Sequence, residues 1–226
     1  MPPYERMFYT NTCSLSNRES TGQAVQSVSG SVDLYWLPLG AGGHSVRLNG
    51  KAFEVVAALL EKRKRLDLYH SALEVTIGHE RFVIEQAPVW PRGGNRGVVA
   101  EGPVGAQWAG ALPIFRYEVR CWPDGVIPDA DEAIESPRRL SNDLLVAQRL
   151  IALAPQVPTP TWVRDELRTG EMWNSNSIVS WLLARAGLDA AAVLPPEGGR
   201  APGWRAGLVL AARQEGARVD ASNEPA

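Results

Sequence analysis

Apolar residues recur at helical spacing in three stretches of the chain, so that each stretch would present one apolar face. This pattern predicts helices over residues 50–62, 142–153 and 176–186. Ser141 is a favourable N-cap residue just before the second helix, and Gly187 is a favourable C-terminal residue just after the third. We expect these helices to pack against a sheet through their apolar faces.

Other stretches are rich in β-branched and aromatic residues, or alternate between apolar and polar side chains, which is typical of strands. They predict strands over residues 32–37, 66–77, 80–87 and 114–122, and a further one over 206–212. The segments 88–105 and 123–137 are rich in Pro, Gly and Asp, and we expect them to be loops.

Two of the predicted strands are separated only by Gly78 and His79, a link that is typical of a hairpin with a primed turn. In that register Ala72 faces Glu85, so His70 and Glu85 lie on one face of the sheet as diagonal neighbours. The hairpin, together with the lack of βαβ units, predicts the α+β class, with an antiparallel sheet packed against helices.

The distribution of polar residues sets the expected domain boundaries. Residues 1–30 contain few large apolar side chains and are expected to form a disordered leader. Residues 31–212 are expected to form one α+β domain, and residues 213–226 a disordered tail.

Composition narrows the range of partners and cofactors. The 226 residues carry a net charge of −2, which gives no sign of a nucleic-acid partner. Two cysteines are too few for a disulfide framework, and no Cys/His cluster has the spacing of a zinc site. The apolar runs are too short for a membrane span. We therefore expect a cytoplasmic protein without metal or cofactor, in which Cys121 fills space on the apolar face of its strand.

The residues Asn174, Ser175, Asn176 and Ser177 open directly into the third predicted helix. One interpretation is a well-capped core helix. The other is a site for a nucleophile or an anion, because free backbone N–H groups and partial positive charge gather at a helix N-terminus.

His70 and Glu85 also allow two interpretations. A histidine beside a carboxylate can act as a general base with a group that orients it. The pair can equally form a structural hydrogen bond, or Glu85 can simply point at water.

A histidine strand followed later by a polar helix start resembles the circularly permuted papain-like hydrolases, which include PPPDE-type peptidases and lecithin:retinol acyltransferase-like enzymes. The resemblance covers residues 66–187. It implies that His70 is the base, that Glu85 is the third polar residue, and that Asn174–Ile178 is the nucleophile segment. Ser175 stands where that family has cysteine, and a serine would depend on His70 as general base.

Two functional hypotheses follow. In the first, the protein is a hydrolase or acyltransferase for an amide, ester or thioester, in which Ser175 attacks, His70 transfers the proton and Glu85 orients the imidazole. Asn174, Asn176 and Ser177 would then support the oxyanion through their backbone amides. In the second, the same papain-like domain is catalytically inactive and binds a peptide or a protein.

Overall fold

The computed structural model describes residues 28–39, 67–89, 97–127 and 129–223. The helix predicted over 50–62 and residues 1–27 of the predicted leader lie outside these described residues.

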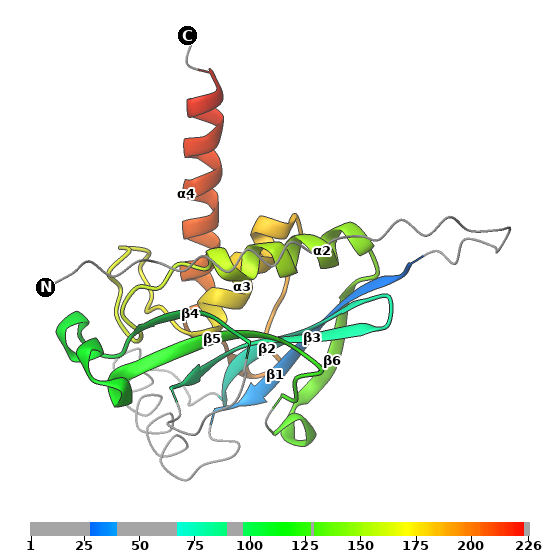
Figure 1. Cartoon of the computed structure of the whole chain (residues 1–226), viewed down its shortest axis with the longest axis horizontal. Coiled ribbons are helices and arrows are strands. Elements are labelled where there is room, and N and C mark those ends of the chain that lie inside the picture. The colour runs from blue at the N-terminus through cyan, green and yellow to red at the C-terminus, as the bar shows by residue number, and fades with distance from the viewer. Residues whose placement is uncertain (1–27, 40–66, 90–96, 128, 224–226) are drawn as a thin grey trace, which may run out of the picture.

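The described residues form a largely antiparallel sheet with strand order β4-β5-β3-β2-β1-β6, as Figure 1 shows. Its strands are β1 (Gly30–Pro38), β2 (Asp67–Ile77), β3 (Glu80–Pro88), β4 (Val98–Pro103), β5 (Arg116–Pro123) and β6 (Ile134–Ser141). The short β7 (Gly199–Arg200) pairs in parallel with the start of β2. With three α-helices packed beside it in the described ranges, this sheet confirms the α+β class.

The predicted hairpin is present between β2 and β3. Gly78 and His79 form its turn, and Gly78 has φ = +62°, a conformation that glycine adopts without steric cost. Ile77 pairs with Glu80 and Leu73 with Ile84, which is the predicted register.

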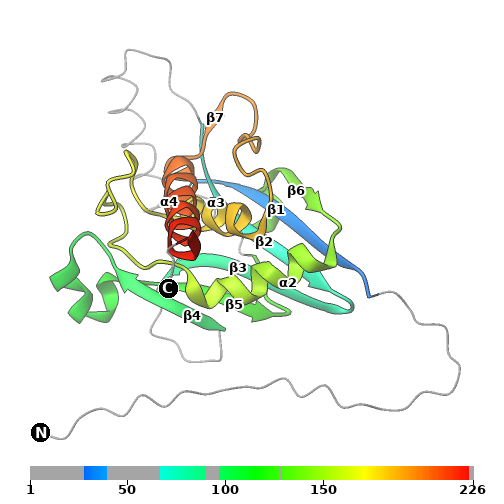
Figure 2. The ribbon, with the colours of Figure 1, turned by 90° about the horizontal axis from the view of Figure 1, so that it is seen from above.

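The helices lie on one side of the sheet (Figures 1 and 2). Helix α2 (Leu144–Leu153) packs on β1 and β2, and α3 (Ser175–Ala186) packs on β2 and β3. Helix α4 (Trp204–Asn223) packs on α3 and projects away from the sheet. No helix in the described ranges is both long and apolar enough to cross a membrane.

Residues 206–212 were predicted as a strand, and this prediction is wrong. They lie in α4, where Ala206 and Ala211 are buried. Residues 213–223, which were expected in a disordered tail, continue the same helix. A short apolar run fits a buried strand and a buried helix equally well, and only the packing against α3 separates the two.

The predicted loops over residues 88–105 and 123–137 include the edge strand β4 and the first half of the edge strand β6, so these loop predictions are wrong there. Both contain proline, and β6 carries Arg138 and Arg139. Proline and charge are common on edge strands, because one side of such a strand pairs with no neighbour. The cap of α2 is Asp143 rather than Ser141, since Asp143 Oδ1 accepts a hydrogen bond from the Leu145 amide at 2.7 Å.

Side chains on the two faces of the sheet belong to different cores. The larger core lies under the helices and includes Leu34, Trp36, Leu73, Ile84 and Leu182. The smaller core lies on the opposite face and consists of the buried residues Leu37, Ala72, Val83 and Ile127. Because strand side chains alternate between faces, membership of either core shows which way neighbouring side chains point.

Candidate functional site

The polar segment before α3 forms a capping box. Asn174 is the N-cap, and its Oδ1 accepts hydrogen bonds from the amides of Asn176 at 2.9 Å and Ser177 at 3.3 Å. Ser177 Oγ accepts in return from the Asn174 amide at 3.1 Å. The amides of Asn176 and Ser177, which were predicted to support an oxyanion, therefore already have an acceptor within the chain.

Two buried side chains of this segment join α3 to its neighbours. Asn176 Nδ2 donates to the Tyr69 carbonyl, and Asn176 Oδ1 accepts from Ser71 Oγ, both at 2.9 Å. Ser177 Oγ donates to the Gly203 carbonyl at 2.8 Å. These bonds tie the start of α3 to β2 and to the start of α4, so the segment is a structural anchor.

The anchor includes two residues that the sequence did not single out. Glu171 Oε2 accepts from the amides of Gly203 at 2.9 Å and Arg205 at 3.2 Å, and so caps the N-terminus of α4. Gly203 has φ = +87°, and a Cβ there would lie 2.5 Å from Asn174 Oδ1. Glycine is therefore required where the two helix starts meet.

Ser175 and His70 lie on opposite sides of the sheet. Ser175 is the first residue of α3, only 8% exposed, and its side chain has no hydrogen bond within the described residues. Tyr69 belongs to the core beneath the helices, and Ser71 binds α3. His70 stands between them on an unbroken strand, so its side chain points to the other face. The structure therefore does not bring the predicted nucleophile and base together.

His70 and Glu85 do share a face of the sheet, but Glu85 is bound to a different residue. Arg120 Nη1 lies 2.9 Å from Glu85 Oε1, and Arg120 Nη2 lies 2.5 Å from Glu118 Oε1. No hydrogen bond joins His70 to Glu85 within the part of the chain that the structure describes. Glu85 is thus a member of a buried charge cluster rather than an orienting group for the histidine.

Burial shifts the pKa of both side chains. It lowers the pKa of the His70 imidazole to about 4, which makes His70 a weak base near neutral pH. Desolvation raises the pKa of the Glu85 carboxyl, and the neighbouring Arg120 opposes that rise.

Cys121 packs against the core beneath the helices, as predicted, and burial raises the pKa of its thiol to about 11. Such a thiol is protonated and unreactive at neutral pH. The described ranges contain no group of three or more His, Cys, Asp or Glu side chains placed to hold a metal ion.

A different surface has the exposure that a binding site requires. Residues 107–115 connect β4 to β5 through two short 3-10 helices, η1 (Gln107–Ala111) and η2 (Pro113–Phe115). We call this segment the apolar loop. It exposes four large apolar side chains: Trp108 by 81%, Leu112 by 54%, Ile114 by 74% and Phe115 by 41%. Apolar side chains gathered in this way on a surface are typical of interaction sites.

The apolar loop is held in place by backbone hydrogen bonds. The Leu112 amide donates to the Ala109 carbonyl, and the Phe115 amide donates to the Leu112 carbonyl, each at 3.0 Å. The Val104 amide donates to the Phe115 carbonyl at 2.8 Å and closes the loop at its base. Its apolar side chains are therefore presented on an ordered backbone.

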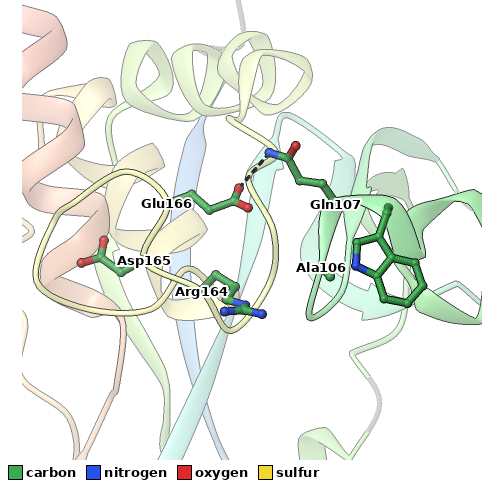
Figure 3. A pocket seen from close by; sticks show the side chains of 6 residues that line it. Ala106, Gln107, Arg164, Asp165 and Glu166 are labelled. Atoms are coloured by element: carbon green, nitrogen blue, oxygen red, sulfur yellow. Dashed lines mark hydrogen bonds between the residues drawn. The ribbon is translucent and has the colours of Figure 1, made fainter.

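An open depression of about 490 Å³ lies beside the apolar loop (Figure 3). Its lining residues come from two segments: Ala106, Gln107 and Trp108, and opposite them Arg164, Asp165 and Glu166. Arg164 Nε donates to the Gly105 carbonyl at 2.7 Å, and Gln107 Nε2 lies 3.5 Å from Glu166 Oε2. These contacts connect the two walls.

The backbone next to the depression is strained at Val163, which has φ = +63°. A β-branched residue is rarely found in this conformation, and such strain concentrates at functional sites. Backbone hydrogen bonds on both sides hold it: the Val163 amide donates to the Trp173 carbonyl at 3.0 Å, and the Trp162 amide donates to the Pro103 carbonyl at 2.9 Å.

Sequence reasoning did not identify the apolar loop or the depression. The run from Trp108 to Phe115 is apolar, and apolar runs are usually buried. Its one unusual feature in sequence is Pro113, which interrupts the run before the β5 strand. Exposure itself depends on contacts with distant residues and leaves no local pattern.

Comparisons of the chain with protein-family models, with curated proteins and with solved structures gave no match. The resemblance to permuted papain-like hydrolases therefore remains a prediction from the sequence.

Proposed function

We propose that this protein is a peptide- or protein-binding module that works without catalysis and binds its partner through the apolar loop. The observation that carries the proposal is the exposure of Trp108, Leu112, Ile114 and Phe115 on one ordered segment. Fully burying a side chain of this kind is worth about 1.5–3 kcal/mol in transfer free energy, so the most exposed ones, Trp108 and Ile114, have most to gain in an interface.

The architecture of the apolar loop supports this function in two further ways. Its backbone is ordered by internal hydrogen bonds, so little conformational entropy is lost on binding. Trp108, the most exposed of its large apolar side chains, is of the residue type most enriched among interface hot spots.

The binding test uses the full chain as bait for a library of displayed random peptides. We expect the wild type to enrich a set of related peptides. The double variant Ile114→Ser, Phe115→Ser should lose them, because it removes two exposed apolar side chains without opening a core.

Leu194→Ser is the matched control. Leu194 is 67% exposed, and its carbonyl accepts from Arg138 on β6, at the opposite edge of the sheet from β4. This variant should retain the enriched peptides. The proposal fails if nothing is enriched, or if the enriched peptides bind the double variant as tightly as the wild type.

A further inference from the structure

We draw no further inference here: the strongest candidate, the outer edge of strand β4 between Val98 and Glu101, meets no further strand within the described residues, and nothing in the structure shows what covers it.

Discussion

At the scale of single residues, burial decides what the polar side chains can do. Asn176 and Ser177 are almost fully buried, and their side chains bond to the backbones of β2 and of the residues before α4. Glu85 and Glu118 are buried with Arg120 between them. Removing one partner from such a set leaves a buried group unpaired, which costs more than the bond contributes.

His70 predicts a specific dependence of stability on pH. The pKa of His70 is about 4 in the folded protein and about 6.5 in the unfolded chain. Its contribution to the free energy of unfolding is therefore complete above pH 6.5. As the pH falls from 6.5 to about 4, the unfolded chain takes up a proton that the folded protein does not. The free energy of unfolding should therefore fall by up to about 3 kcal/mol in this window.

The measurement is urea unfolding of wild type and His70→Gln from neutral pH to pH 4. The variant should lose this part of the pH dependence, and His79→Gln, which removes the exposed histidine of the hairpin turn, is the matched control. Parallel pH profiles for wild type and His70→Gln would contradict the prediction.

At the scale of elements, the contact between α3 and α4 depends on Gly207. A Cβ at this position would lie 2.1 Å from the Ser177 carbonyl oxygen and 2.2 Å from Ser180 Oγ. Real atoms do not approach so closely, so α4 would have to move away from α3. Above this contact α4 projects from the body, and a Cβ at Gly216 would meet nothing within 4 Å.

These two glycines predict opposite effects of one substitution. Gly207→Ala should lower the free energy of unfolding by about 1–3 kcal/mol, because it overpacks the helix contact. Gly216→Ala should raise it by up to about 1 kcal/mol, because alanine is the better helix former. Urea unfolding of both variants tests these two predictions. An unchanged free energy of unfolding in Gly207→Ala would show that α4 does not pack on α3 at this distance.

At the scale of the whole molecule, the sheet separates the groups that the hydrolase hypothesis needs together. Ser175 begins α3 on the helical face, while His70 and Glu85 point to the opposite face. The apolar loop connects β4 to β5 and contains none of these three residues. Binding through the apolar loop and catalysis at Ser175 are therefore separable by experiment.

We predict that a fluorophosphonate probe does not label Ser175. The amides of Asn176 and Ser177 are already bonded to Asn174, and His70 cannot reach the hydroxyl through the sheet. Mass spectrometry of the treated proteins should show no probe adduct on the wild type or on Ser175→Ala. Labelling that disappears in both Ser175→Ala and His70→Ala would instead restore the hydrolase hypothesis.

Much of the fold could be predicted because its signals are local. Gly78 and His79 set the hairpin register, and Asn174 and Gly187 mark the ends of α3 through capping bonds within a few residues. The sharing of one face by His70 and Glu85 followed from that register. The edge strands β4 and β6 escaped prediction because proline and charge hide the strand pattern there.

By itself, then, the sequence determined the α+β class, the β2–β3 hairpin, and helices α2 and α3. Only the tertiary structure decided that residues 206–212 form a helix, that Asn176 and Ser177 anchor α3, and that Trp108 and Ile114 stay exposed. The reason is physical. Turns and caps depend on neighbours along the chain, whereas the face that a side chain meets and its burial depend on residues far away in sequence.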